Sequence, residues 1–195
     1  PIAREIDARG EFPWEVIRKM AGLGLLGLPI PEQYGGSGAD TVSYAIAVEE
    51  VSRVSGSIGI TMAAHTSLGL YPLYRFGSEE QKNQYLPRLA SGEGLAAFGL
   101  TEPEAGSDAG GVKTTAVLDG DQWVLNGQKT FITSGSIADV VIIAALTDKA
   151  AGTRGISNFI VEKGTPGFRP GRDEDKMGLK GSVTSELFFE DCRVP

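Results

Sequence analysis

The sequence predicts an α+β protein, with helices in residues 1–95 followed by strands in residues 96–195. In the first part, apolar residues recur three or four positions apart, which is the spacing of one face of a helix. In the second part, the apolar runs are short, several alternate with polar residues, and glycine and proline separate them, as is typical of strands. Because the pattern changes once, near residue 95, we expect two domains, residues 1–95 and residues 96–195.

Four helical segments are expected in the first domain. Pro13 fits the first turn of one helix, where its missing N–H is tolerated, and Asp40 can cap the next by accepting a hydrogen bond from a free N–H group. An apolar stretch over residues 57–74 follows. Ser78 and Gln81 match the capping-box pattern at the start of the last segment, where the hydroxyl and the amide satisfy two end donors.

Short apolar runs predict the strands of the second domain. Asp119-Gly120 and Asn126-Gly127 are dipeptides typical of tight turns, and we expect each of them to join two strands. The five strand candidates are residues 95–101, 112–118, 140–146, 156–162 and 186–190.

The composition argues against several classes of function. The chain has 18 Lys and Arg against 25 Asp and Glu, so its net charge is −7, and we expect no nucleic-acid partner and no membrane association. No apolar run is long enough to span a bilayer. The single cysteine, Cys192, cannot form an internal disulfide, which favours a reducing compartment. Together with the single histidine, His65, it cannot build a zinc site, so we expect no metal and structural roles for both residues. Residues 172–176 are expected to form a solvated turn.

Residues 106–114 nearly match the phosphate loop of nucleotide-binding proteins. Val112 separates the last glycine from Lys113, which places the lysine out of register with the phosphate cradle. A phosphate loop must also lead into a helix, whereas this segment leads into a strand pattern. We therefore expect no nucleoside-triphosphate site.

Two short segments have the residue types of a ligand site. A strand is expected to end at Thr101, after which Pro103 fixes a turn, and Gly106 and Ser107 then offer backbone N–H groups and a hydroxyl to a phosphate or another polar ligand. A simple polar turn explains this segment equally well. Further on, Phe131 and Thr133 are expected on one face of a strand, where a ring beside a hydroxyl suits a planar heterocycle.

Taken together, the two segments are specific. Thr101-Glu-Pro-Glu-Ala-Gly-Ser-Asp108 and Asn126-Gly-Gln-Lys-Thr-Phe-Ile-Thr133 resemble, in order and spacing, two motifs of the acyl-CoA dehydrogenase family. The resemblance covers essentially the whole chain. It extends to Leu28–Gly36, Phe76–Lys82, Tyr85–Pro87, Met177–Ser182 and Phe189–Pro195.

The resemblance implies a fold of three parts, of which this sequence holds two. An N-terminal helical bundle would be followed by a middle antiparallel β-barrel, and a C-terminal four-helix domain would be missing. The catalytic carboxylate base of the family usually lies in that third domain. We therefore assign no catalytic residue in this chain and expect it to be inactive alone.

The resemblance also implies an FAD site. Thr101 would bond the pyrimidine edge of the flavin ring, Gly106 and Ser107 would approach its phosphate side, and Ser107 would also touch the CoA part of the substrate. Phe131 would pack against the ring, in place of the family's more common tryptophan, and Thr133 would bond near the reactive nitrogen. The full set of expected cofactor-binding residues is Phe98, Leu100, Thr101, Gly106, Ser107, Phe131, Ile132 and Thr133.

The activity implied is oxidation of the Cα–Cβ bond of an acyl-CoA thioester to the trans-2-enoyl-CoA. A base would remove the α-proton while the flavin accepts a hydride, and electrons would pass to an electron-transfer flavoprotein. Lys149 and Arg154 bracket a loop that is a candidate for contact with CoA phosphates. The full-length protein would be a homo-oligomer of the bacterial cytoplasm or mitochondrial matrix. A reduced-flavin-dependent monooxygenase of the same fold and a non-catalytic binding module remain as alternatives.

Overall fold

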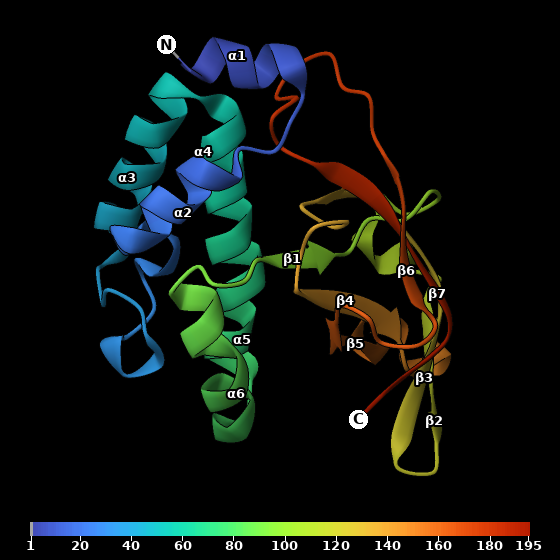
Figure 1. Ribbon diagram of the computed structural model, residues 1–195. Coiled ribbons are helices and arrows are strands. Elements are labelled where there is room, and N and C mark those ends of the chain that lie inside the picture. Colours follow the sequence, from blue (N-terminus) through green and yellow to red (C-terminus); the bar gives the residue numbers. More distant parts are fainter. Residues whose placement is uncertain (1) are drawn as a thin grey trace. The chain divides into compact units, whose positions relative to one another are not determined.

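A computed structural model describes residues 2–195 of the chain (Figure 1). The chain divides into two compact units. One contains the residues up to Ala96 together with Asp175–Val183, and the other contains Ala97–Glu174 together with Thr184–Pro195. The chain therefore enters the second unit, returns to the first for nine residues, Asp175–Val183, and goes back again.

The first unit is helical, as expected. The predicted apolar stretch 57–74 forms one continuous helical rod, in which a π-helical segment joins two α-helices. A short N-terminal helix that the sequence pattern did not predict precedes these elements. The α-helices are α1 (Ile2–Arg9), α2 (Trp14–Gly22), α3 (Thr41–Val54), α4 (Gly56–Ala63), α5 (Tyr71–Phe76) and α6 (Glu79–Ala90); η1 (Leu25–Gly27) and η2 (Glu32–Tyr34) are 3-10 turns, and η3 (Ala64–Leu70) is the π-helix.

The helix starts follow the predicted capping chemistry. The Asp40 carboxylate accepts a hydrogen bond from the N–H of Ser43 at 2.7 Å, at the start of α3. At the start of α6, the Gln81 N–H donates to the Ser78 hydroxyl at 3.2 Å and the Ser78 N–H donates to the Gln81 side chain at 2.9 Å. Both caps are confirmed. Pro13 stands one position earlier than expected, as the residue before the first turn of α2.

His65 has the structural role expected of it. Its ring is buried inside the π-helical segment η3. Nδ1 accepts a hydrogen bond from the N–H of Ala96 at 3.0 Å, and Nε2 lies 3.1 Å from the carbonyl oxygen of Leu89. Nε2 therefore carries the proton, and the ring joins the helix to the chain that leaves α6.

The second unit is built on a seven-stranded sheet of order β1-β4-β2-β3-β7-β6, and the seventh strand, β5, also pairs with β4. Nearly all the assigned pairings are antiparallel, and β2 meets β4 in parallel at Thr115 and Leu146. The strands are β1 (Ala96–Gly99), β2 (Thr115–Asp119), β3 (Gln122–Thr133), β4 (Val140–Leu146), β5 (Ile156–Glu162), β6 (Phe168–Asp173) and β7 (Thr184–Val194), with 3-10 turns η4 (Ala109–Gly111) and η5 (Lys149–Gly155). The predicted α+β fold, a helical bundle followed by an antiparallel β domain, is confirmed.

The hydrophobic core of the second unit lies on one face of the sheet, which is formed by every second residue of its strands. Leu125, Ile143 and Leu187 are fully buried there, together with Cys192. Burial raises the pKa of the Cys192 thiol to about 11. Cys192 is therefore an apolar core residue within β7, in agreement with the structural role expected of it.

The predicted turn at Asn126-Gly127 is wrong, because both residues lie inside the long strand β3. The Asn126 side chain donates to the carboxylate of Asp191 at 3.1 Å and accepts from the Asp191 N–H at 2.9 Å, opposite a bulge of β7. Gly127 permits a close approach, since a Cβ there would lie 2.5 Å from Oγ1 of Thr114. The other predicted turn is confirmed: Gly120, at φ 68°, begins the two-residue loop between β2 and β3.

The acidic run near residue 172 is only partly a turn. Arg172 and Asp173 belong to β6, and the Asp173 carboxylate accepts a hydrogen bond from the Ser136 hydroxyl at 2.7 Å. Within residues 2–195, no group of three or more His, Cys, Asp or Glu side chains is arranged to hold a metal ion. Across the same described range, no helix has the length and apolar character needed to cross a bilayer.

Candidate functional site

The two segments singled out from the sequence are hydrogen-bonded to each other. In the part of β3 that follows its pairing with β2, the N–H of Thr130 donates to the carbonyl oxygen of Thr101 at 2.9 Å. The Lys129 ammonium donates to the carbonyl oxygen of Leu100 at 3.2 Å. The chain after β1 and the last part of β3 therefore form one continuous patch of the second unit.

A buried ion pair holds this patch together. Nζ of Lys129 lies 2.7 Å from Oε1 of Glu102, and the two side chains are 0 % and 5 % exposed. The Glu102 carboxylate also accepts hydrogen bonds from the N–H of Thr114 at 2.9 Å and from the N–H of Lys113 at 2.6 Å. Glu102 therefore closes the base of the loop formed by residues 103–112.

The pair has the electrostatics of an ionised buried contact. Burial raises the pKa of the Glu102 carboxyl, but the hydrogen bonds from Lys129 and from residues 113 and 114 outweigh it and hold that pKa below its ordinary value. Burial lowers the pKa of the Lys129 ammonium, and the Glu102 carboxylate opposes this effect. Each charge therefore depends on the other to remain stable in the interior.

A tight turn sets the direction of the loop. The N–H and carbonyl groups of Glu102 and Ala105 bond each other reciprocally, at 3.0 and 3.1 Å, around Pro103 and Glu104. Gly106 follows at the surface, and a Cβ placed on it would meet nothing within 4 Å. Ser107 is also exposed, and within the described chain its hydroxyl has no hydrogen-bond partner. The tip of the turn therefore has open space and free polar groups.

The residues before the turn alternate between the core and the opposite side. A Cβ on Gly99 would lie 2.6 Å from Ile143 and 3.2 Å from Cγ of Lys129, so this position faces the core and the lysine stem crosses it. Phe98 and Leu100 are half-buried, as is Thr101. Among residues 2–195, the N–H and hydroxyl of Thr101 find no hydrogen-bond partner, which leaves them available to a ligand.

A bulge shapes the end of β3. The register against β7 shifts between Lys129 and Ile132, and Phe131 within this interval has φ 58°. The Phe131 ring is 63 % exposed, whereas the Ile132 side chain is buried in the core of the sheet. Of the expected site residues, Ile132 can therefore offer only its backbone to a ligand. Thr133 follows at a half-buried position.

The sequence interpretation missed Glu102 and Lys129 as site residues. A usable signal was present, because alternation from Leu125 places residue 129 on the same, inward face of the strand. A lysine on an inward face requires a buried acidic or carbonyl partner. The mistaken turn at residues 126 and 127 broke the strand and concealed this register.

A second loop lies beside the loop of Ser107. The position of a Cβ on Gly110 is 2.8 Å from Cγ2 of Thr153, which places η4 against η5. Asp148 caps η5 by accepting from the N–H of Ala150 at 2.9 Å. Lys149 and Arg154, the basic residues expected to contact CoA phosphates, are exposed at the two ends of this loop.

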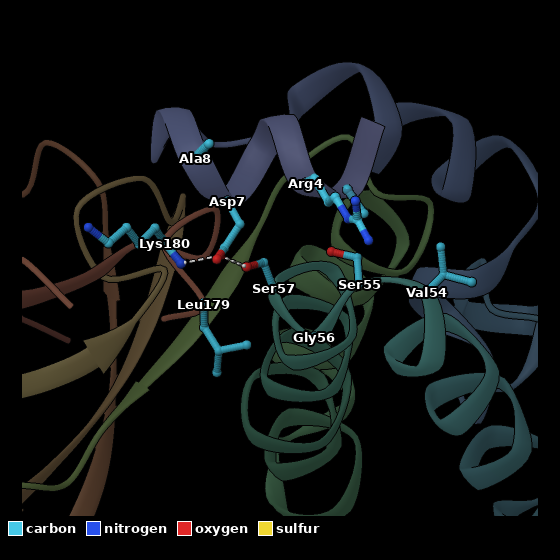
Figure 2. Close-up of a pocket in the computed structure, with 10 residues that line it drawn as sticks. Arg4, Asp7, Ala8, Val54, Ser55, Gly56, Ser57, Leu179 and Lys180 are labelled. Carbon is cyan, nitrogen blue, oxygen red and sulfur yellow. Dashed lines mark hydrogen bonds between the residues drawn. The ribbon is translucent and has the colours of Figure 1, made fainter. Parts of the chain in front are cut away.

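A separate pocket of about 490 Å³ lies in the first unit, between α1, the start of α4 and residues 179 and 180 (Figure 2). The Asp7 carboxylate accepts hydrogen bonds there from the N–H of Lys180 at 2.7 Å and from the Ser57 hydroxyl at 3.2 Å. These contacts tie three segments of the helical unit together. None of the site residues expected from the sequence lines this pocket.

Comparison with known proteins agrees with this arrangement. The family model of the acyl-CoA dehydrogenase N-terminal domain matches residues 1–93, and that of the middle domain matches residues 97–192. A short-chain specific acyl-CoA dehydrogenase of Clostridium acetobutylicum is 52 % identical to this chain. The match covers 100 % of this chain and 52 % of that protein. The chain spans about half the length of the curated relatives it matches.

Two solved structures are similar across both units. A chain in a structure titled for the electron transferring flavoprotein of Acidaminococcus fermentans matches with a TM-score of 0.97 and 52 % identity, over 100 % of this chain and 51 % of that one. An acyl-CoA dehydrogenase complexed with FAD from Bacillus anthracis matches with a TM-score of 0.85 and 46 % identity, over 93 % of this chain and 31 % of that one. With both domain models matched in order over nearly all its residues, the chain belongs to the acyl-CoA dehydrogenase family.

Proposed function

We propose that the protein containing this chain is an FAD-dependent acyl-CoA dehydrogenase, which converts an acyl-CoA thioester to the trans-2-enoyl-CoA. The observation that supports it best is the hydrogen bond from Thr130 to Thr101, because it joins the two segments whose sequences resemble the family's flavin-site motifs. The free polar groups and the exposed ring of the patch lie on these two segments. Bound FAD would supply the hydride acceptor.

The residues present fit such a cofactor. The unpartnered N–H and hydroxyl of Thr101 match the donor and acceptor edge of a pyrimidine ring. The exposed Phe131 residue offers a flat apolar wall, and half-buried Thr133, two residues further along β3, offers a hydroxyl donor. The open space at Gly106 allows a phosphate to approach the backbone closely.

These residues would tune the reaction by hydrogen bonding. A hydroxyl donor from Thr133, placed at the edge of the ring that gains negative charge, stabilises that charge in the transition state. Thr101 would fix the orientation of the ring at its other edge. No acid or base is assigned among residues 2–195, because the family's base usually belongs to its third domain.

We assign the CoA part of the substrate to the neighbouring loops. The free hydroxyl of Ser107 and the exposed cations of Lys149 and Arg154 lie on the two adjoining loops, η4 and η5 being in contact. Hydroxyl and cationic donors bind phosphates well. The short-chain specificity named for the Clostridium relative supports a short acyl chain.

The electron acceptor we propose is an electron-transfer flavoprotein, in keeping with the Acidaminococcus structure. The full-length protein would be a homo-oligomer of the bacterial cytoplasm or mitochondrial matrix.

The test is flavin reduction by a thioester. The full-length protein, purified with FAD, is mixed anaerobically with butyryl-CoA, and bleaching of the flavin absorbance is followed. Bleaching with formation of the enoyl thioester supports the proposal. A flavin that bleaches only with an external reductant and then consumes oxygen would support the monooxygenase alternative. A folded protein that shows no affinity for FAD would support a non-catalytic module.

A further inference from the structure

We propose that Glu102 and Lys129 are positioning residues, whose buried ion pair holds the backbone of Leu100 and Thr101 and the loop of Ser107 in the arrangement that receives the flavin. The inference rests on the proposed function and adds two residues to it. Neither side chain can touch a ligand directly, since the two are 0 % and 5 % exposed. Their effect would therefore pass through the groups that they bind.

The first step of the argument is what Lys129 fixes. Its ammonium donates to the Leu100 carbonyl oxygen at 3.2 Å, while the next residue, Thr130, donates its N–H to the Thr101 carbonyl oxygen at 2.9 Å. Two successive carbonyl groups are thus tied to two successive residues of β3. With its carbonyl held, Thr101 has its N–H and its hydroxyl left for a ligand.

The second step is what Glu102 fixes. Its carboxylate receives the N–H groups of Lys113 and Thr114, at 2.6 and 2.9 Å, as well as the Lys129 ammonium. These bonds close the loop of residues 103–112 at its base. Because Gly106 and Ser107 lie inside that loop, their position depends on the same carboxylate.

The third step concerns why an ion pair joins these segments, since removing two charges from water costs free energy. A buried ion pair is often no more stabilising than apolar residues of similar size, so stability alone gives little reason to keep it. Carbonyl and N–H groups, however, cannot be held in place by an apolar side chain. The Lys129 stem also crosses Gly99, where a Cβ would lie 3.2 Å from its Cγ, so β1 leaves room for it.

The chain offers a matched control. Glu104 and Lys113 form a second ion pair of the same loop, and both of these side chains are 68 % exposed. The pair has the same chemistry, and its carboxylate lies two residues from Glu102, but its side chains bind neither Leu100 nor the backbone at residues 113 and 114. Its removal should not disturb the flavin-facing backbone.

The experiment compares four forms of the full-length protein: wild type, Glu102→Gln with Lys129→Met, Lys129→Met alone, and the control Glu104→Gln with Lys113→Met. The double variant at the buried pair removes both charges together and should fold, since no unpaired charge remains. Amide hydrogen exchange is measured for residues 98–114 and for the Thr130 N–H. FAD affinity and the rate of flavin reduction by butyryl-CoA are measured in parallel.

We expect the double variant to unfold at nearly the wild-type temperature, yet to exchange the Thr130 N–H faster and to bind FAD at least about tenfold more weakly, with flavin reduction slowed by about tenfold to a hundredfold. The control variant should match the wild type in every measurement. A folded double variant with wild-type exchange, FAD affinity and reduction rate would overturn the inference. A wild-type protein that does not bind FAD would instead contradict the proposed function, while hydrogen exchange would still test the pair.

Discussion

Asp7, in the first helix, accepts a hydrogen bond from the backbone N–H of Lys180, 173 positions further along the chain. The same carboxylate oxygen accepts the hydroxyl of Ser57 at 3.2 Å, so one atom joins α1, the start of α4 and the segment 175–183 (Figure 2). We predict that Asp7→Ala lowers the free energy of unfolding by about 1.5–3 kcal/mol, the range for hydrogen bonds to a charged group. Urea denaturation measures this, and the amides of residues 179–182 should exchange faster.

The control for that prediction is Asp175→Ala. Asp175 is fully exposed and lies 3.8 Å from the Lys180 ammonium, so its pairing is screened by water. Its removal should change the free energy of unfolding by less than about 0.5 kcal/mol. Equal effects of the two substitutions would show that the Asp7 contacts do not hold the segment.

The Glu102 carboxylate should give the protein an acid-sensitive component of stability. Its folded-state pKa lies below the ordinary 4.5 because hydrogen bonds outweigh burial, so its contribution is present above pH 4.5 and is lost as the pH falls through the folded pKa. At neutral pH, Glu102→Gln leaves the Lys129 charge unpaired and should cost about 3–5 kcal/mol. This difference in unfolding free energy should shrink as the pH is lowered below 4.5. A difference that stays constant with pH would mean that the carboxyl is not ionised in the folded protein.

Thr133→Ala in the full-length protein should slow flavin reduction, because it removes the donor proposed to stabilise negative charge on the ring. Loss of one such donor typically costs a factor of about a hundred or more. Stopped-flow absorbance with butyryl-CoA measures the rate. Thr133→Ser keeps the hydroxyl and should restore most of it. Unchanged reduction in the alanine variant would remove Thr133 from the site.

Two glycines should separate binding from folding. A Cβ on Gly106 meets nothing within 4 Å, so Gly106→Ala should leave the unfolding free energy within about 0.5 kcal/mol of wild type while weakening FAD binding. A Cβ on Gly127 would lie 2.5 Å from Oγ1 of Thr114, and Gly127→Ala should cost about 1–3 kcal/mol. Thermal unfolding and FAD titration of both variants make the comparison. Normal FAD affinity in Gly106→Ala would place the phosphate elsewhere.

Cys192 should be inert in the folded protein. Its thiol is fully buried and its pKa is raised to about 11, so almost no thiolate is present at pH 8. Iodoacetamide should label it only after unfolding, as measured by mass spectrometry. Rapid labelling of the native protein would show that β7 opens locally.

Local signals predicted the helical unit well, and their success has a local cause. The caps at Asp40 and Ser78 depend on groups three residues away, so the sequence contains all their partners. The strands 140–146 and 156–162 were predicted with the bounds that the structure has, because one is apolar throughout and the other has its apolar residues gathered in a short run, and both signals lie within the strand itself. Helix α1 buries little beyond Ile6 and strand β6 is mostly polar, so neither has a clear apolar pattern.

The errors arise where distant residues decide the conformation. Asn126-Gly127 has the composition of a turn, but its side-chain partner is Asp191, 65 positions away, and that contact keeps the strand continuous. The bulge at Phe131 likewise depends on its register against β7. Motif resemblance identified the segments of the candidate site. Predicting the ion pair between residues 102 and 129 required the register of the strand, and the turn wrongly expected at residues 126 and 127 concealed it.

The return of residues 175–183 to the first unit has a practical consequence for dissecting the protein. Gly181 has no side chain where Ile6 and Ser57 approach it, so the backbone of segment 175–183 packs directly against the helical unit. A gene fragment that ends near residue 95 would lack this segment and leave Ile6 exposed to water. Such a fragment should aggregate more readily than one to which residues 175–183 are supplied as a synthetic peptide.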